Sequence, residues 1–338
     1  MESTLKKYAD RIERGEINAH IRCEGLEGGL IFDPLREEVP LSILGFGIYH
    51  LSPEYIVRET GEREMVLVPQ DGFFEAEIDG KYFSGERKGG PLALGIGKTN
   101  ASALYVPIGS TLRICGEGEI AFFEAPSMGK KPPFHLQQSA AKVSSRGGWV
   151  WRRDIVNLIS PRDASTRLVV GETLSPPGFW SGTPLHLHDK DDLGQGESDF
   201  EEVYYHRLSP CTPVGSRFDA FGVQLLFDGK NLSKSYILGD KSAVAIPGGA
   251  HPVVASPVCS HLYLWGLAGS GADLLARDLP EFIHLKRIEE IIHVLGKGRA
   301  PKSVAASEFD SLCSKHGISG DHKVLLLAML GDQDIRVE

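Results

Sequence analysis

The chain has 338 residues, of which 41% are hydrophobic, and a formal net charge of -9. A chain of this length accommodates about two domains, and its apolar content is enough for a sizeable core. Its negative charge, without any long basic run, excludes ordinary nucleic-acid binders, because these carry a basic patch.

Neither a membrane span nor a secretory leader is expected. The first residues, MESTLKKYADRIERGE, have no apolar core of the signal-peptide kind. No segment approaches the roughly 18 consecutive apolar residues of a membrane helix. Five scattered cysteines without a CxxC motif indicate buried thiols in a reduced, cytoplasmic protein.

The first half of the chain is predicted to be a β domain that follows a charged arm. Residues 1–17 are expected to form this arm, exposed and able to be helical. Over residues 18–143, short apolar runs alternate with Gly, Pro and Asp turns, a pattern typical of strands. The alternating segment GFFEAEIDGKYF reaches Asp79-Gly80, which predicts a hairpin. Residues 124–148, rich in Pro, Gly, Lys and Ser, are expected to be a linker.

The second half repeats the strand pattern and then becomes helical. Strand-like segments such as TRLVVGETL, EEVYYHRL and HLYLWGLAG fill residues 144–272. In the tail, 273–338, the segment DLPEFIHLKRIEEIIHVLG carries apolar residues at helical spacing and ends at Gly296. Two further short helices are predicted in ASEFDSLCSKHG and HKVLLLAMLG. The predicted plan is therefore an arm, two β domains and a helical tail.

The two β domains look like copies of one unit. Glu64 opens EMVLVPQDG and is followed 43 residues later by Pro107 in YVPIGST. Glu202 opens EVYYHR and is followed 45 residues later by Pro247 in AIPGGAH. This parallel predicts a duplicated β domain and aligns Glu64 with Glu202.

Three histidines and a glutamate in the second copy form a candidate metal site. In PLHLHDK, His186 and His188 point to the same face of a strand because side chains two apart share a face. Glu202 opens the next apolar strand, and His251 follows the PGGA turn. If the strand of Glu202 pairs with that of the histidines, the four groups can meet. Such a nitrogen and oxygen set suits Zn, Mn, Fe, Ni or Co.

The alternative is that the HxH pair lies on a wet strand and binds nothing. The first copy provides a comparison, because it has SPEYIVRETGERE at the place of the HxH and Thr111 at the place of His251. If this fold needed the histidines for structural reasons, the first copy would carry them too. Their absence there favours a metal site in the second copy and a plain scaffold in the first.

The phrases around these residues resemble a known family. GETLSPPGFWSGTPLHLHD, EEVYYHRLSP and AIPGGAHPVVASPVCSHLYLWGLAG are similar to the 5-deoxyglucuronate isomerases of myo-inositol catabolism, relatives of the 4-deoxy-5-ketouronate isomerases. TGEREMVLV and RRDIVNLI fit the same family, so the resemblance runs over about residues 40–270. The arm and the last ~60 residues have no counterpart in it, which leaves the oligomeric state and the particular substrate open.

The resemblance implies a fold, a reaction and a cofactor. The fold is all-β, with two tandem cupin β-barrels (a bicupin) followed by the short helical tail. The reaction is aldose–ketose isomerisation of 5-deoxyglucuronate or a close deoxyuronic acid, assisted by a divalent metal in the second barrel, with Zn²⁺ preferred over Mn²⁺ or Fe²⁺. By motif match, the metal ligands are His186, His188, Glu202 and His251.

The reaction also needs a proton shuttle and a cation for the carboxylate of the substrate. Tyr204 shares a strand face with Glu202, and Lys190 closely follows the HxH, so both are candidate catalytic residues. The alternative for Tyr204 is a structural tyrosine on a partly solvent-exposed strand. Gln224 lies in an apolar strand and faces either inward or outward. The candidate cations are Arg152, Arg153 and Arg217, against the alternative that they are surface arginines.

Two other function classes fit the same residues. A metal-dependent cupin oxygenase uses an identical ligand set, and metal content and oxygen dependence separate the two. A non-catalytic sugar-acid-binding bicupin needs no metal. In every case the expected partner is a small sugar acid, with no nucleic acid and no membrane. The amphipathic tail helix favours a homo-oligomer, most simply a dimer.

Overall fold

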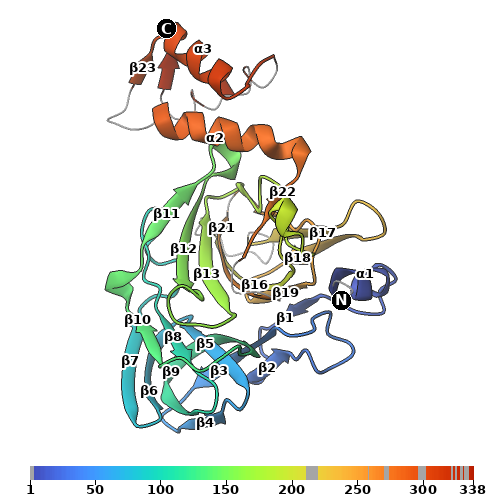
Figure 1. Ribbon diagram of the computed structural model, residues 1–338. Coiled ribbons are helices and arrows are strands. Elements are labelled where there is room, and N and C mark those ends of the chain that lie inside the picture. Colours follow the sequence, from blue (N-terminus) through green and yellow to red (C-terminus); the bar gives the residue numbers. More distant parts are fainter. Residues whose placement is uncertain are drawn as a thin grey trace.

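The structure is a computed structural model of the chain. The first half of the chain forms one nine-stranded sheet (Figure 1). The described residues are 4–210, 220–257, 259–269, 274–295, 302–320, 323, 326–327, 330 and 335–338. The strands of the first half are β2 (Gly29–Phe32), β3 (Gly45–Leu51), β4 (Ile56–Glu59), β5 (Arg63–Pro69), β6 (Gly72–Ile78), β7 (Lys81–Arg87), β8 (Ala103–Val106), β9 (Thr111–Pro126) and β10 (Phe134–Leu136).

The second half forms a seven-stranded and a four-stranded sheet. Side chains from both sheets share one buried cluster, so the two sheets pack face to face. The strands are β11 (Val143–Arg146), β12 (Arg153–Ile159), β13 (Val169–Ser175), β14 (Trp180–Ser181), β15 (His186–Leu187), β16 (Phe200–Pro210), β17 (Gly222–Phe227), β18 (Ser233–Leu238), β19 (Ser242–Ile246), β20 (Val253–Ala255), β21 (Cys259–Gly269) and β22 (Arg277–Asp278). The short 3-10 helices are η1 (Gln138–Ala140), η2 (Trp149–Trp151), η3 (Leu193–Gln195) and η4 (Pro280–Phe282).

The predicted hairpin at Asp79-Gly80 is confirmed. β6 and β7 pair in register from Ile78 opposite Lys81, so the loop has two residues. Asp79 has φ 48° and Gly80 has φ 79°, and two positive φ values in a two-residue loop are the signature of a type I′ turn. The sequence pair Asp-Gly is favoured there because both residues tolerate this conformation.

The predicted duplication is confirmed by the strand pairing, but the alignment of the two glutamates is wrong by one residue. β5 lies between β8 and β9, and β16 lies between β19 and β21. Met65 pairs with Val106, and Glu202 pairs with Ile246, each just before the turn proline. Met65 is therefore the counterpart of Glu202. Because successive strand residues face opposite sides, this shift decides which side chain enters the barrel.

The glutamates next to these positions tie the two halves together. Glu64 accepts hydrogen bonds from the backbone amides of residues 166–168, at 2.7 to 2.9 Å. Glu201 accepts hydrogen bonds from the amides of residues 42–44, at 2.7 to 3.1 Å. Each half thus holds a loop of the other through a buried carboxylate, and each carboxylate is satisfied by several donors. The largest apolar cluster also takes residues from both halves.

The N-terminal arm is helical but not exposed. α1 (Thr4–Glu13) has one apolar face, and this face is buried in the same cluster as Tyr204 and Leu226 of the second half. β1 (His20–Arg22) then pairs with β19, so it belongs to the second half's sheet. The expectation of an exposed arm is wrong because the spacing of Leu5, Tyr8, Ala9 and Ile12 makes the helix amphipathic.

The segment expected to be a linker contains strands. β9 runs to Pro126, β10 pairs with β8, and β11 pairs with β12. Most side chains of β10 and β11 are half-buried or exposed. These edge strands are held by backbone hydrogen bonds rather than by side-chain burial. Amino-acid composition does not reveal such pairing, which is why a linker was expected here.

The tail forms a small body of its own at the end of the second half (Figure 1). Helix α2 (Ile283–Leu295) confirms the first predicted tail helix and buries Ile288, Ile291, Ile292 and Leu295 against Trp151. Helix α3 (Ala306–Lys315) confirms the second, and β23 (Lys302–Val304) pairs in parallel with β24 (Ile335–Val337). The third predicted helix, HKVLLLAMLG, lies largely outside the described residues.

The helices and the cysteines bear on two expectations from the sequence. None of the described helices is long and apolar enough to span a membrane. The thiols within the described residues are buried, as expected, and they are Cys23, Cys115, Cys259 and Cys313.

Candidate metal centre

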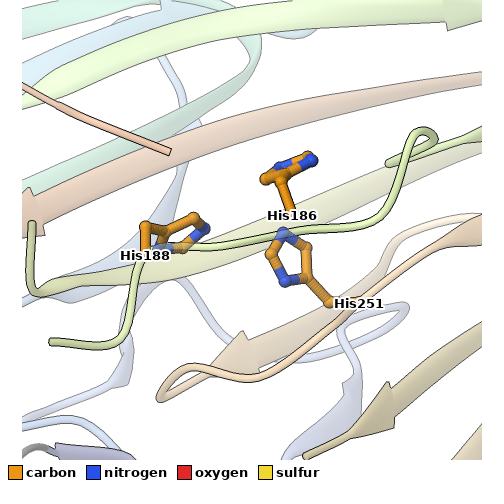
Figure 2. Close-up of side chains that lie close together, drawn as sticks. All are labelled: His186, His188 and His251. Carbon is orange, nitrogen blue, oxygen red and sulfur yellow. The ribbon is translucent and has the colours of Figure 1, made fainter. Parts of the chain in front are cut away.

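Three histidines converge inside the second barrel, as Figure 2 shows. His186 lies on β15, His188 follows that strand, and His251 follows the glycine turn after β19. One ring nitrogen of each lies within 4.8 Å of those of the other two. Among the residues that the structure describes, this is the one group of three or more side chains with metal-ligand spacing.

Glu202 completes the set from the neighbouring strand. Its Oε2 lies 3.4 Å from Nε2 of His188 and 3.2 Å from Nε2 of His251. The expected pairing between the HxH strand and the strand of Glu202 is not observed, because β15 pairs with β22. The two segments are instead linked through their backbones where the amide of Phe200 donates to the carbonyl of His188 at 2.8 Å. The four groups predicted from sequence therefore come together by a different route.

The three imidazoles are oriented in the same way. In each ring Nδ1 lies within hydrogen-bond distance of a backbone carbonyl, which fixes the tautomer with the proton on Nδ1 and leaves the Nε2 lone pair available. Nε2 of His251 is buried and has no hydrogen-bond partner. The anchoring carbonyls are those of Pro184 for His186 (3.0 Å), Phe200 for His188 (2.9 Å) and Gly249 for His251 (2.7 Å).

The residues present fit a divalent metal ion. Three available imidazole nitrogens and one carboxylate oxygen form a mixed donor set of the kind that binds Zn²⁺, Mn²⁺ or Fe²⁺. Without such an ion, the buried Nε2 of His251 would remain unsatisfied, which is costly in a protein interior. The backbone carbonyls behind the rings are the outer partners that metal-binding histidines usually have.

A second layer of groups holds His251 in place. Gln224, fully buried, donates from Nε2 to the carbonyl of His251 and, at 3.3 Å, to that of Pro252. The inward-facing alternative for this glutamine is thus the observed one. Gly249 has φ 83°, and a Cβ there would lie 2.9 Å from the carbonyl oxygen of Phe227. The PGGA turn therefore needs glycine at this position, both for its conformation and for its close approach to β17.

Burial and charge perturb the pKa of the cluster in the absence of a metal. Burial, followed by repulsion from His251 and His188, lowers the pKa of His186 to about 4. Burial acts against ionisation of Glu202, but the adjacent imidazoles of His188 and His251 outweigh it and lower the pKa of Glu202 to about 2. Burial also acts against a charged His188, but the adjacent carboxylate of Glu202 raises its pKa overall. The carboxylate is therefore ionised and His186 neutral, which are the forms that bind metals.

Three side chains with hydroxyl groups, Tyr204, Tyr263 and Ser181, lie next to one another beside the cluster, and we call them the hydroxyl chain. The ring of Tyr204 lies 5.7 Å from that of His251 and 4.3 Å from that of Tyr263. The hydroxyl of Tyr263 lies 2.6 Å from Oγ of Ser181. Burial raises the pKa of Tyr204 well above its ordinary value, so its phenol stays protonated. Neither Tyr263 nor Ser181 was predicted from the sequence.

Two further histidines lie deeper in the same barrel. His206 and His261 are fully buried, and their rings are joined by a 3.0 Å contact between Nδ1 of His206 and Nε2 of His261. Burial, and then the charge of His261, lowers the pKa of His206 well below its ordinary value. Burial also lowers the pKa of His261, to about 3. Both rings are therefore neutral in the folded protein.

The other predicted catalytic residues are not brought into the cluster. Nζ of Lys190 lies 3.2 Å from Asp192, and the lysine side chain is 47% exposed, so it is directed to solvent. The short exposed turn after the HxH carries it away, and the geometry gives no support to a catalytic Lys190. Arg217 lies outside the described residues. Arg152 and Arg153 line a cavity of about 750 Å³ that also opens onto His186.

Comparison with known proteins identifies the family. The family model described as the KduI/IolB family matches residues 24–285. The chain belongs to the KduI/IolB family. It is 30% identical over 247 residues to the 5-deoxy-glucuronate isomerase of Geobacillus kaustophilus, covering 72% of this chain and 86% of that protein. It is 27% identical over 244 residues to the protein of the same name from Shouchella clausii, covering 71% and 86%.

Solved structures bear on the fold of this KduI/IolB protein. An IolB-like protein from Salmonella typhimurium superposes with a TM-score of 0.71 at 23% identity, covering 80% of this chain and 99% of the other. A variant of Bacillus subtilis oxalate decarboxylase superposes with a TM-score of 0.52 at 11% identity, covering 84% and 85%. The predicted all-β fold of tandem cupin barrels with a helical tail is confirmed.

Proposed function

We propose that this KduI/IolB protein is a metal-assisted aldose–ketose isomerase that acts on 5-deoxyglucuronate or a close deoxyuronic acid. The observation that carries the proposal is the convergence of three carbonyl-anchored imidazoles and one carboxylate beside a cavity, in a chain whose relatives are named 5-deoxy-glucuronate isomerases. The role in myo-inositol catabolism follows from the same resemblance and is part of the proposal. A cytoplasmic location and a dimer remain predictions.

In this proposal the metal is held by His186, His188, Glu202 and His251. When bound, a divalent ion supplies a Lewis acid that stabilises negative charge developing on the oxygens of the substrate. Zn²⁺ is the first choice, and Mn²⁺ and Fe²⁺ suit the same donors. The backbone carbonyls that bind each Nδ1 hold the rings ready, so little reorganisation is needed on binding.

The hydroxyl chain supplies protons in the proposed reaction. Isomerisation removes a proton from the carbon next to the carbonyl and returns one to the former carbonyl carbon, so oxygens of the substrate gain and lose protons on the way. Tyr204 stays protonated because burial raises its pKa, so it is suited to donate a hydrogen bond or a proton rather than to act as the base. Tyr263 and Ser181 connect Tyr204 to a polar path within the barrel.

The proposal is tested by measuring turnover of 5-deoxyglucuronate on purified protein before chelation, after chelation and after return of Zn²⁺, Mn²⁺ or Fe²⁺. We expect isomerisation that is lost with the metal and restored with at least one of these ions. Full turnover by metal-free protein would contradict the metal-assisted mechanism. Oxygen consumption without isomerisation would replace the proposal with a cupin oxygenase, and sugar-acid binding without any reaction would replace it with a binding protein.

A further inference from the structure

The cavity beside the candidate metal centre is enclosed by two separate parts of the chain. One wall comes from β11, β12 and the turn between them, and the opposite wall comes from helix α2. Figure 1 shows α2 lying across the end of the sheet that contains β11 and β12. His186 and Pro184 also line the cavity. The volume of about 750 Å³ is in the range of pockets that hold small molecules.

Three arginines line the β11–β12 wall of this cavity. Arg146 of β11 and Arg153 of β12 are directly opposite each other in the ladder, and Arg152 precedes Arg153. Like charges directly opposite each other in a sheet destabilise it. Within the part of the chain that the structure describes, none of the three guanidinium groups takes part in an ion pair; Arg153 donates to the carbonyl of Trp151 at 3.2 Å. The wall therefore concentrates positive charge that the protein does not neutralise.

The acidic groups at the cavity do not neutralise this wall. Asp278 pairs with Lys286, and Glu290 lies 3.1 Å from Nδ1 of His316. Glu289 of α2 lines the cavity from the opposite wall. An anionic ligand placed between the walls would supply a counter-charge for the arginines, and guanidinium groups bind carboxylates through two parallel hydrogen bonds.

We propose that Arg146, Arg152 and Arg153 form a subsite that binds the carboxylate of the sugar acid, with the reacting carbons directed toward His186. This inference rests on the proposed function for the direction of the substrate, but the subsite itself requires only a sugar acid as ligand. Arg152 and Arg153 are half-buried, whereas Arg146 is exposed. Burial raises the pKa of Tyr263, and the positive charge of Arg153 is among the effects that offset this rise.

Helix α2, which forms the opposite wall, limits the size of the ligand that the cavity can hold. The family match ends at residue 285, so nearly all of α2 lies beyond it. Its cavity-lining side chains, among them Glu289 and Ile292, face the arginine wall and limit how far a ligand can extend from His186. The tail of this chain therefore takes part in the proposed substrate pocket.

The first test is kinetic and compares Arg153→Gln and Arg146→Gln with Arg22→Gln, which removes an exposed arginine of β1 that does not line the cavity. Loss of a charge-assisted hydrogen bond is expected to raise KM for 5-deoxyglucuronate by about 10- to 100-fold, with kcat nearly unchanged. KM for 5-deoxyglucose, which lacks the carboxylate, should be the same in all proteins. Equal KM values for the acid in Arg153→Gln and Arg22→Gln would overturn the subsite.

The second test does not depend on isomerase activity. Calorimetric titration of the purified protein with glucuronate should show affinity that falls about 10-fold or more in Arg153→Gln and less in Arg153→Lys, which keeps the charge and loses the fork. If the unsubstituted protein turns nothing over but this pattern holds, the subsite stands and the proposed function fails. If glucuronate binds Arg153→Gln, Arg153→Lys and the unsubstituted protein equally, the subsite is overturned whatever the activity. If Arg153→Gln does not fold, the affinity of Arg153→Lys for glucuronate is compared with that of the unsubstituted protein instead.

Discussion

The two barrels share their strand order and differ in what fills them. Inside the first barrel the buried cluster is apolar and includes Met65, Leu67 and Phe74. The corresponding space of the second barrel holds His188, Glu202, His251, Gln224 and other buried polar groups. The same β ladder therefore carries either a packed apolar core or a polar site, and the choice depends on side chains at equivalent positions rather than on the backbone.

Two positions show this difference directly. Met65 is fully buried where the second barrel has Glu202. Thr111 stands where the second barrel has His251, and its hydroxyl donates to Glu59 at 2.7 Å at the surface. We propose that residues 18–143 are a scaffold cupin without a metal site and that residues 144–272 are the metal-binding cupin. The described strand β1 nevertheless joins the sheet of the second unit.

The largest effect is expected from removing a proposed metal ligand. His188→Ala takes away one imidazole from a buried set of four donors, so metal content and isomerase turnover should fall together to background. The matched change in the first barrel, Thr111→Ala, should leave both within about twofold, because that position contacts no metal donor. Metal analysis and turnover on the same samples check this, and retained turnover in His188→Ala would remove the metal from the mechanism.

Placing the ligand of the second barrel into the first should destabilise the protein. Met65→Glu buries a carboxylate among apolar side chains, with none of the imidazoles that accompany Glu202. We expect a loss of about 3–5 kcal/mol in the free energy of unfolding, as for other unpaired buried charges. Met65→Leu should cost less than about 1.5 kcal/mol. Urea unfolding measures both, and equal stability of the two variants would show that the first barrel can accommodate a charge.

The hydroxyl of Tyr204 should matter for turnover and not for stability. Tyr204→Phe removes the proposed proton donor and keeps the ring, so kcat should fall by about 100-fold or more, the usual size of acid–base catalysis. Tyr49→Phe is the matched change in the first barrel, where the ring of Tyr49 stacks on Phe122 at 4.4 Å. It should leave kcat unchanged. An unchanged kcat in Tyr204→Phe would assign the proton transfer to another group.

The support behind His251 should tune metal affinity. Gln224→Leu removes the amide that donates to the carbonyl of His251, and outer partners of this kind contribute about 10- to 100-fold in metal affinity. Gln70 is equally buried in the first half and donates at 3.3 Å to the carbonyl of Val68. Gln70→Leu should leave metal affinity unchanged. Competition with a chromophoric chelator distinguishes the two, and equal affinities would mean that Gln224 does not position His251.

The last prediction concerns pH and the buried histidine pair. Because burial lowers the pKa of both His206 and His261, the unfolded chain binds protons near pH 6.5 that the folded chain does not. Their contribution to stability is complete above that pH and is lost as the pH falls toward about 3, the folded pKa of His261. Each should add a slope of about 1.4 kcal/mol per pH unit over this window. The test is urea unfolding of the metal-free double variant His206→Phe/His261→Phe from pH 7 to 5. Its free energy of unfolding should change less steeply with pH than that of the unsubstituted protein. Parallel curves of unfolding free energy against pH for the two proteins would contradict this.

Much of the site could be predicted from sequence because its signals are local. The HxH pair, the following glutamate and the histidine after a glycine turn each carry their own pattern, and all four residues meet. The register was harder, because Glu201 and Glu202 are adjacent and only the pairing with Ile246 shows which one faces the site. The direction of Lys190 could not be predicted, because closeness in sequence does not fix the direction of an exposed turn.

The features that sequence could not reveal depend on contacts between distant segments. The opposition of Arg146 and Arg153 requires the register of β11 with β12. The placement of α2 over the cavity requires the packing of its apolar face against Trp151. Periodicity predicted α2 itself, but not the surface it would cover, since an amphipathic helix packs equally well on its own domain or on another chain.

The central claim is that one barrel of the two holds a metal. Anomalous diffraction from crystals grown with Zn²⁺ tests it most directly. We predict a single peak per chain, at about 2.0–2.2 Å from Nε2 of His186, His188 and His251 and from a carboxylate oxygen of Glu202, the usual distances for zinc. A peak elsewhere in the chain, or fully formed crystals of active protein with no peak, would contradict the account.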